Sequence, residues 1–462
     1  MDALATLRSR VEGTVTGPDD AGYDDVRAIW NAMIDRRPAA LVRAAGVGDI
    51  AATIAVAREL GLVLAVRGGG HNVAGNGTVE GGIVLDLGGL TDVVVDPNTR
   101  EVRVSPGATL GHLDRATEPH GLAVPVGVVS GTGVAGLTLG GGVGWLTHAY
   151  GLTVDNLLAA DVVTASGETL RASAADDPDL FWGVRGGGGN FGVVSSFTFR
   201  AYPLGPDVHA GTFVSRADTW EAALRGIDVW THGDVPDPMT VIVTFMTPPH
   251  EFGLGDDPVM LTGFVWASAD RAAGDGVVDG LRAAIRPDVE VIAPTSWTAW
   301  QSAADGLFPK GVRAYWKNTS FDRLDDATID IICRRGREQT WFGTGFDIHV
   351  MDGAFGRVDE DATPFPGRSA RYWLNIYGYW PDAADDPART AFVRGFAADM
   401  APHAGGAQYV NFLGNEGSVS EARAGALAVY GPAKLERLTA LKRRYDPDNL
   451  FRRNLNVRPT VK

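Results

Sequence analysis

The chain has 462 residues, 45% of them hydrophobic and 21% charged, and its formal net charge is -15. A chain of this length usually needs more than one hydrophobic core, so we expect at least two domains. The acidic balance argues against nucleic acid and anionic membranes as partners, because both attract clustered Lys and Arg.

Helices and strands alternate irregularly in the first part of the chain. Residues 38–71 predict a strand, a helix and a second strand, with Asp49 as the helix cap and Gly61 at its end. Three short strands, a helix over 109–121 and a hairpin that turns at Ser166 and Gly167 follow. The segment 191–204 is typical of a long strand, and we expect it to close the first domain.

Apolar and aromatic strands mark a second domain from residue 205. The stretches "VIVTFM", "VMLTGFVWA" and "YWLNIYGYW" alternate with helical runs such as "TWEAALRGIDVW", which favours an antiparallel sheet backed by helices. A helix, a "DPDN" turn and an extended tail follow. We therefore predict an α+β fold with a first domain at 1–204, a second at 205–415 and a C-terminal segment at 416–462 that returns to the first domain.

Residues 121–154 contain no Asp, Glu, Lys or Arg, and a run of this length could cross a bilayer. The same run holds ten glycines. Each glycine weakens a helix by about 1 kcal/mol relative to alanine. We therefore expect irregular backbone around a large buried ligand instead of a membrane span.

Three glycine clusters dominate the first domain: "RGGGHNVAGNG" at 67–77, "SGTGVAGLTLGGGVG" at 130–144 and "RGGGGNFG" at 185–192. Glycine-rich loops expose backbone N–H groups that hold a pyrophosphate, so the clusters predict one long phosphate-bearing ligand. The second cluster also matches G-x-G-x-x-G, with Asp155 near the place of a ribose-binding acid. A Rossmann site needs a helix that opens at the third glycine, and the following "LTLGGGVG" argues against one.

Four motifs in this order resemble the berberine-bridge-enzyme-like branch of the vanillyl-alcohol-oxidase flavoprotein family. They are "VRGGGHNVAGNG", "GLTVDNLLAADVVTASGE", "LFWGVRGGGGNFGVV" and "RRYDPDNLFRRN". The resemblance extends from about residue 38 to the C terminus. It implies a PCMH-type FAD-binding domain followed by a substrate domain, and it says little about the substrate.

The resemblance implies that FAD lies along the glycine clusters and is joined through its 8α-methyl group to His71. A neutral imidazole suits that bond, and the alternative is a histidine that only satisfies loop carbonyls. Many members attach the flavin a second time through a cysteine, but the matching position here is Val129, and Cys333 lies far along the chain. We therefore predict one covalent link. The residues expected to bind FAD are Arg67, Gly68, Gly69, Gly70, His71, Asn72, Val73, Gly75, Val129, Ser130, Gly131, Thr132, Gly133, Gly136, Leu137, Gly141, Gly142, Gly144, Trp145, Asn156, Gly189, Asn190, Phe191, Gly192, Val194, Tyr430 and Asn454.

Two catalytic candidates follow from the resemblance. Thr132 matches a position beside the flavin that affects the access of oxygen, and the alternative is plain packing of the loop. Tyr430 matches the family's catalytic tyrosine, and the alternative is an aromatic anchor for the helix after it. A tyrosine with its ordinary pKa near 10 is a poor base at neutral pH, so it needs a nearby cation, for which Lys317 and His349 are candidates.

The second-domain strands supply the remaining candidates, because polar residues there alternate with apolar ones. Lys317 shares a predicted strand face with Tyr315, Asp347 shares one with His349, and Asn375, Tyr377 and Tyr379 share a third. The alternative for each face is exposure to solvent. Asn411 is expected on a strand near the same site.

The sequence therefore predicts an FAD-dependent oxidase that takes a hydride from a carbon bearing a hydroxyl or an amine and reduces O2 to H2O2. The aromatic second domain favours a small hydrophobic natural product or N-heterocycle as substrate. An oxygenating flavoenzyme of secondary metabolism, an oligosaccharide oxidase and a non-catalytic flavin-binding interaction protein stay open. A single cysteine excludes metal sites built from several thiolates, and with a first segment lacking a secretory core it leads us to expect a cytoplasmic protein. The oligomeric state is left open.

Overall fold

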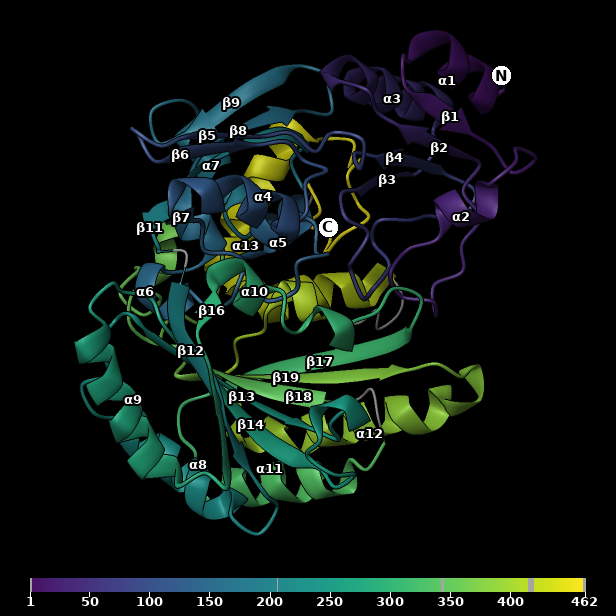
Figure 1. Cartoon of the computed structure of the whole chain (residues 1–462). Helices are drawn as coiled ribbons and strands as arrows, with labels where there is room; N and C mark the ends of the chain where they lie inside the picture. Colours follow the sequence, from purple (N-terminus) through teal and green to yellow (C-terminus); the bar gives the residue numbers. More distant parts are fainter. Residues whose placement is uncertain (1, 206, 342–344, 414–418, 460–462) are drawn as a thin grey trace.

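The computed structural model describes residues 2–205, 207–341, 345–413 and 419–459. It has two halves, one above the other in Figure 1, with two small sheets and the two-stranded pair β7-β11 in the upper half and one large sheet in the lower half. Helices and antiparallel sheets are mixed without regular alternation. The predicted α+β fold is therefore confirmed.

The upper half holds the elements as far as residue 203 together with the C-terminal helix. The first sheet follows the order β1-β2-β4-β3 and contains parallel pairs, and the second is antiparallel in the order β5-β6-β10-β8-β9. The elements are α1 (Ala3–Arg10), β1 (Thr14–Thr16), α2 (Tyr23–Arg27), β2 (Ala40–Arg43), α3 (Val47–Leu60), β3 (Leu64–Arg67), β4 (Ile83–Asp86), β5 (Val93–Asp96), β6 (Glu101–Val104), α4 (Leu110–Thr117), β7 (Leu122–Ala123), α5 (Val134–Gly140), α6 (Thr147–Tyr150), β8 (Leu157–Val163), β9 (Thr169–Ser173), α7 (Pro178–Val184), β10 (Val193–Arg200) and β11 (Tyr202–Pro203).

The lower half is built on one antiparallel sheet in the order β15-β12-β14-β13-β18-β19-β17, with β16 paired to β12. Its elements, and those that follow to the end of the chain, are β12 (Asp207–Ser215), α8 (Trp220–Thr231), β13 (Met239–Met246), β14 (Val259–Trp266), α9 (Arg271–Ile285), β15 (Val289–Ile292), β16 (Thr295–Ser296), α10 (Trp297–Gln301), η4 (Asp305–Leu307), β17 (Arg313–Phe321), α11 (Asp326–Glu338), β18 (Gly345–Val350), β19 (Tyr372–Trp380), α12 (Asp386–Met400), η8 (Val410–Phe412) and α13 (Val419–Tyr445).

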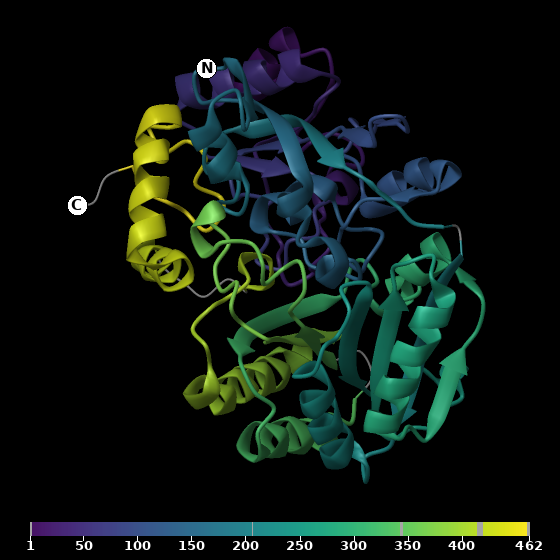
Figure 2. The same cartoon turned by 90° about the vertical axis from the view of Figure 1, so that its left-hand side faces the viewer.

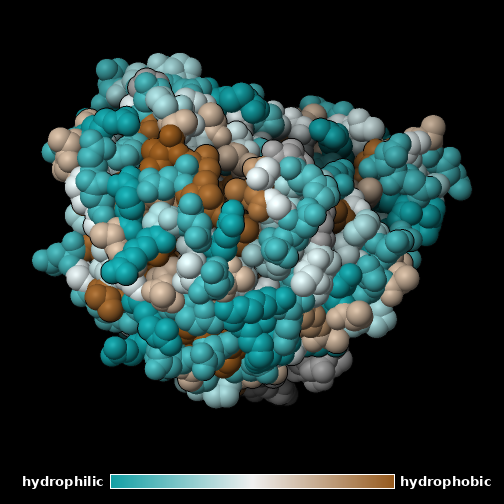
Figure 3. Space-filling view, turned by 60° about the horizontal axis from the view of Figure 1, so that its bottom comes forward, coloured by the Kyte–Doolittle hydropathy of each residue, from teal (hydrophilic) through white to brown (hydrophobic). Residues whose placement is uncertain are grey.

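The two faces of the large sheet differ in what covers them. Helices α8, α9, α11 and α12 lie beneath one face (Figure 1) and enclose the largest apolar core, to which Leu374 and Ile376 of β19 belong. Side chains alternate along a strand, so Asn375 and Tyr377 point to the opposite face, toward the upper half. Viewed with the lower half turned forward, the surface is mostly hydrophilic, with one band of hydrophobic residues and others scattered singly (Figure 3).

The C-terminal segment packs on the upper half, where α13 stands at its outer side (Figure 2). Val429, Leu438 and Leu441 of this helix share a core with strands β6, β8 and β10. The tail after it is fixed by a buried pair, because Lys442 Nζ donates to Asp446 and to the carbonyls of Asn190 and Phe451. The domain limits at 204 and 415 stay a prediction.

Two local expectations were wrong. Helix α3 begins at Val47 with Gly46 as its cap, and Asp49 instead accepts hydrogen bonds from three backbone N–H groups, although Gly61 ends the helix as expected. Helix α5 opens directly after Gly133, within the run expected to be irregular. In the described part of the chain no helix combines the length and apolarity that a membrane crossing requires.

One carboxyl group is buried where the two halves meet. Asp114 on α4 is 3% exposed, and within the described residues neither of its oxygens has a hydrogen bond of normal geometry. Helix α10 packs against α4 here. Burial raises the pKa of Asp114 to about 7, while the Trp297 indole and the Arg115 charge oppose the rise and Glu118 and Asp305 add to it.

The raised pKa makes stability depend on pH at this site. The folded state favours the neutral carboxyl, so the stabilisation is complete below the ordinary pKa of 3.8 and is lost as the pH rises through about 7. The difference in pKa corresponds to about 4 kcal/mol. We expect the Tm of Asp114→Asn to rise relative to that of the parent protein between pH 5 and pH 8, as measured by thermal unfolding. The exposed control Asp218→Asn should follow the parent, and a difference for Asp114→Asn that does not change with pH would contradict the assignment.

Candidate functional site

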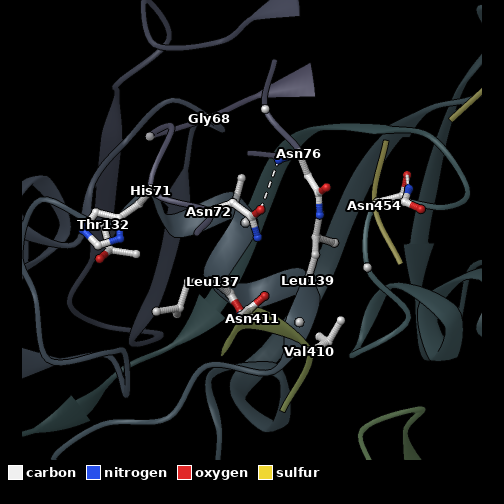
Figure 4. Close-up of a pocket in the computed structure, with 18 of the residues that line it drawn as sticks. Gly68, His71, Asn72, Asn76, Thr132, Leu137, Leu139, Val410, Asn411 and Asn454 are labelled. Carbon is white, nitrogen blue, oxygen red and sulfur yellow. Dashed lines mark hydrogen bonds between the residues drawn. The ribbon is translucent and has the colours of Figure 1, made fainter. Parts of the chain in front are cut away.

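A large cavity lies between the two halves. It holds about 1770 Å³ of empty space with its open mouth included. The glycine clusters line its upper part, and β17, β18 and β19 of the large sheet contribute to its lower part. Figure 4 shows part of this lining. The lining of the cavity therefore extends from the glycine clusters of the upper half to the large sheet of the lower half.

Two glycine loops meet backbone to backbone at the upper wall. A Cβ atom on Gly69 would lie 2.5 Å from the Gly133 nitrogen, and a Cβ on Gly133 would lie 2.4 Å from the Gly69 nitrogen. Only glycine fits at both positions without a shift of backbone. The contact places His71 and Thr132, each close in sequence to one of these glycines, on the lining of the same cavity.

Several polar groups at the cavity have unused hydrogen-bonding capacity. Arg67 pairs with Asp86 through Nη2 at 2.9 Å, but its buried Nη1 has no partner in the described residues, and neither has Asn454 Oδ1. Arg453 lines the cavity too, and its pKa is lowered to about 10 by burial and by the charge of Arg36. The free Arg67 donor and the positive charge of Arg453, next to glycine-rich loops, suit a pyrophosphate. The site therefore fits the FAD that the sequence implied.

His71 is held in a neutral form at the cavity. Its ring stacks on Trp30, with ring centroids 4.7 Å apart and planes 22° apart. Burial lowers the pKa of His71 to about 4, although Asp305 opposes this. The imidazole is therefore uncharged at neutral pH, as a nucleophilic nitrogen must be.

The position that matches the second flavin attachment site is occupied by Val129 and not by a cysteine. Val129 lines the cavity, and Ser130 after it binds the Asp305 carboxylate through its N–H at 2.7 Å and through its hydroxyl. Cys333 lies on α11 within the core beneath the large sheet, where burial raises the pKa of its thiol to about 12. Its location argues against any contact with the cavity.

The lower wall carries one buried carboxylate with two neighbours that face the cavity. Tyr377 Oη donates to Asp347 Oδ2 at 2.8 Å, and Asn375 Nδ2 donates to Asp347 Oδ1 at 2.8 Å. His349 Nε2 lies 3.3 Å from Asp347 Oδ1 without the alignment of a hydrogen bond. Tyr377 and His349 line the cavity, whereas Asp347 lies behind them. Burial and the Asp347 charge raise the pKa of Tyr377 well above 10.

Aromatic rings surround these polar groups. Trp316 contacts Tyr377 edge to face with centroids 5.1 Å apart, and Phe308 and Phe412 approach the Tyr377 ring at 5.6 and 5.7 Å. The indole N–H of Trp316 has no partner in the described residues. This half of the cavity therefore offers apolar faces with a few polar atoms, which is typical of sites for small organic molecules.

Two of the predicted catalytic residues, Tyr430 and Lys317, lie apart from the residues around Asp347. Tyr430 lines the cavity, but its hydroxyl donates to the Gly186 carbonyl at 3.3 Å, and burial alone raises its pKa. Lys317 shares a strand face with Tyr315 as predicted, but that face belongs to the helix-covered side of the sheet, and Lys317 does not line the cavity. The expectation that Lys317 would assist Tyr430 was therefore wrong.

The structure sorts the residues expected to bind FAD into three groups. Ser130 and Gly131 line a second cavity on the other side of the His71 loop. Eight more are not part of the lining of the main cavity. These are Val73, Gly75, Gly141, Gly142, Gly144, Trp145, Asn156 and Phe191. Trp145, for example, packs against Trp300. The main cavity is lined by Arg67, Gly68, Gly69, Gly70, His71, Asn72, Val129, Thr132, Gly133, Gly136, Leu137, Gly189, Asn190, Gly192, Val194, Tyr430 and Asn454.

Some of the outlying residues have structural tasks that explain their place. Asn156 donates to the carbonyls of Tyr150 and Leu152, so it shapes a turn. Asp155, the candidate ribose-binding acid, forms a buried two-bond ion pair with Arg368 at 2.7 and 2.8 Å. This pair joins the upper half to the segment between β18 and β19. Asp155 is therefore not available to a ribose.

Sequence reasoning missed several residues of the lining, namely Asn76, Phe308, Trp316, Tyr409, Phe412, Arg453 and Leu455. Tyr409 and Phe412 flank Asn411, which also lines the cavity but on η8 instead of a strand. Arg453 could have been found beside Asn454 in the tail motif. Trp30 carries no local signal at all, because its contact with His71 joins two separate segments of the chain.

Comparison with known proteins agrees with this geometry. A model of the "FAD binding domain" family matches residues 38–173, and one of the "Berberine and berberine like" family matches residues 409–458. (R)-6-hydroxynicotine oxidase of Paenarthrobacter nicotinovorans is 32% identical over 480 residues, covering 99% of this chain and 98% of that protein. Glucooligosaccharide oxidase of Sarocladium strictum is 26% identical, covering 96% of this chain and 91% of that protein.

Solved structures show the same fold. The crystal structure of 6-hydroxy-D-nicotine oxidase from Arthrobacter nicotinovorans superimposes with a TM-score of 0.85 at 27% identity, covering 97% of this chain and 98% of that one. Xylooligosaccharide oxidase from Myceliophthora thermophila C1 gives a TM-score of 0.87 at 24% identity over the whole of both chains. The chain belongs to the berberine-bridge-enzyme-like family of FAD-linked oxidoreductases. It is an FAD-dependent oxidase of that family.

The glycine contact gives a direct test of the site. We expect Gly69→Ala to push the two loops apart, because its Cβ would meet Gly133 backbone at 2.5 and 2.7 Å, and so to weaken FAD binding by at least about tenfold. Reconstitution of FAD-free protein, followed by flavin fluorescence, measures this. Gly48→Ala is the matched control, because no atom lies within 4 Å of its added Cβ. Equal FAD affinity for both variants would show that the loops do not need this contact.

Proposed function

We propose that the protein is an oxidase with FAD joined through one bond to His71, which oxidises a carbon bearing a hydroxyl or an amine in a small, largely hydrophobic molecule and reduces O2 to H2O2. The observation that carries this proposal is the continuity of the cavity. The glycine loops and His71 line one part of it, and Tyr377 and His349 line another part of the same space. A cofactor along the glycine loops thus shares one space with a substrate at the sheet.

When bound, FAD supplies the acceptor for a hydride from the substrate carbon. The chain's own residues must take the accompanying O–H or N–H proton. We assign this task to Tyr377 and Asp347. Tyr377 lines the cavity, and its phenol oxygen accepts the substrate proton while the phenol proton, already directed at Asp347 Oδ2, passes to the carboxylate. The raised pKa of Tyr377 means that the proton comes to rest on Asp347 and that no free phenolate is needed.

Tyr430 is less suited to the same task. Its hydroxyl proton is directed at the Gly186 carbonyl, which cannot accept a proton as a base at neutral pH. Burial opposes its ionisation. His349 provides a second group on the cavity that lies against Asp347, and it can hold the substrate hydroxyl or amine in place.

The surroundings of Tyr377 support a hydrophobic substrate. Phe308, Trp316 and Phe412 present aromatic rings, and the Trp316 N–H is a donor available to one polar atom of the substrate. A site for an oligosaccharide needs more polar groups to match its many hydroxyls. The relatives include oxidases named for 6-hydroxynicotine and for glucooligosaccharides. The aromatic lining favours a ring compound of the first kind, such as an N-heterocycle or a natural product.

The single link is tested by denaturation. Because His71 is neutral and Val129 replaces the cysteine, we expect acid-denatured protein to keep its yellow colour and one flavin-bearing peptide to contain His71. His71→Ala should bind FAD through the glycine loops and release it on denaturation. Free FAD from the parent protein, or a flavin on Cys333, would falsify the single histidyl link.

The activity is tested by a screen of alcohols, N-heterocyclic amines and oligosaccharides, with anaerobic bleaching of the flavin and peroxide release in air as the two readouts. We expect a ring compound to bleach the flavin. With that compound, Tyr377→Phe and Asp347→Asn should slow anaerobic flavin reduction by about 10²- to 10⁴-fold, the usual effect of losing a general base.

Tyr379→Phe is the matched control, because Tyr379 follows on the same strand face but does not line the cavity. It should reduce its flavin at a rate close to that of the parent. Tyr430→Phe should lose less than Tyr377→Phe. The reverse order would return the role of base to Tyr430, and bleaching by oligosaccharides alone would contradict the proposed substrate class.

A further inference from the structure

The ring of Trp30 covers one face of the His71 imidazole. The two rings are stacked, with centroids 4.7 Å apart and planes 22° apart. Trp30 itself is 4% exposed, so the imidazole rests on a buried, rigid surface. Trp30 precedes both family-matched segments, which begin at residues 38 and 409. The histidine and the ring that supports it thus come from separate parts of the chain.

Trp30 is fixed from several directions. Its backbone N–H donates to the Gly70 carbonyl at 3.1 Å, and its backbone carbonyl accepts from the Gly311 N–H at 3.0 Å. The indole N–H donates to the Phe308 carbonyl at 3.1 Å, and the Trp316 ring packs against its edge at 5.3 Å. Two of these partners belong to the segment that joins α10 to β17. The indole therefore has one orientation, and it transmits that orientation to His71.

The residue after Trp30 strengthens the same connection. Asn31 is 1% exposed, and its side-chain amide donates to the Val73 carbonyl at 2.7 Å and to the Ala314 carbonyl at 2.8 Å. Its Oδ1 accepts from the Ala314 N–H at 2.9 Å. Asn31 thus connects the loop after His71 to the start of β17. Together the two residues hold the histidine loop between the halves of the molecule.

We propose that Trp30 is a positioning residue for the attachment of FAD, which orients the His71 imidazole toward the flavin methyl group before the bond forms. The inference rests on the proposed histidyl link. In the reaction an imidazole nitrogen joins the 8α carbon, which loses one hydrogen, and the imidazole N–H loses its hydrogen. Two electrons and two protons pass to the flavin and leave on O2 as H2O2, so atoms and electrons balance.

A fixed ring raises the rate because the nucleophile spends its time in one orientation. Misplacement of a reacting group by about 1 Å costs on the order of 10²-fold in rate. Without the indole, the imidazole would gain freedom to rotate about its side-chain torsions. The stack also removes water from one imidazole face, which contributes to the burial that lowers the pKa of His71.

The test follows covalent incorporation of FAD into FAD-free protein over time, read as flavin fluorescence of the denatured chain in a gel. We expect Trp30→Leu to bind FAD with an affinity near that of the parent but to form the bond about 10- to 100-fold more slowly. Trp30→Phe should restore most of the rate, because a phenyl ring can still stack. Trp300→Leu is the matched control, since Trp300 packs against Trp145 at 5.2 Å and lacks contact with His71.

The outcomes separate the inference from the proposal on which it rests. If the parent protein carries no covalent FAD, both the proposed histidyl link and the role of Trp30 are overturned. If the parent protein carries covalent FAD and Trp30→Leu forms the bond equally fast, the role of Trp30 is overturned and the histidyl link stands. Equal slowing in Trp30→Leu and Trp30→Phe also overturns it, because stacking would then be irrelevant. If Trp30→Leu does not fold, Trp30→Met, which keeps apolar volume without a ring, decides between the same outcomes.

Discussion

The contact between the Gly69 and Gly133 backbones governs much of the molecule. It brings a loop that follows a parallel strand against a loop that precedes a helix, with no side chain between them. Because α5 starts at the next residue after Gly133, the direction of this helix depends on the same contact. The end of α5 is in turn held from below, where Asn411 donates to the Leu137 carbonyl and Tyr409 accepts from the Gly142 N–H. The two halves are thereby joined around the cavity.

Because side chains alternate along its strands, the large sheet has one apolar face and one face that carries polar residues. One face is sealed by helices and contains the aliphatic core. The other carries Asp347, a carboxylate that is 6% exposed. Burial of a charge is costly unless hydrogen bonds compensate, and here Asn375 and Tyr377 do so. A carboxylate held this way keeps a proton acceptor within reach of a cavity while it shields that acceptor from bulk water.

The sequence specified those features that depend on local pattern. The glycine clusters marked the upper wall, and the alternation in β18 and β19 correctly placed Asp347 with His349 and Asn375 with Tyr377. The same alternation paired Lys317 with Tyr315 but could not tell which face of the sheet meets the cavity, because that depends on where the helices pack. Arg368 pairs with Asp155 across 213 residues, and Trp30 meets His71 from outside every recognisable motif. Contacts of this kind arise from tertiary packing, so neither the periodicity nor the spacing of residues in the sequence predicts them.

The lining of the cavity has a consequence for the order of events during synthesis. The C-terminal tail contributes Arg453, Asn454 and Leu455 to its wall, and the buried Lys442 that fixes this tail comes from α13. These residues follow every strand of the sheets along the chain, so a ribosome releases them after the sheets have emerged. The wall is incomplete until then, so the cofactor meets its finished site only after this tail has been made. A nascent chain that has not yet reached residue 453 would lack that wall, which links loading of the cofactor to synthesis of the tail.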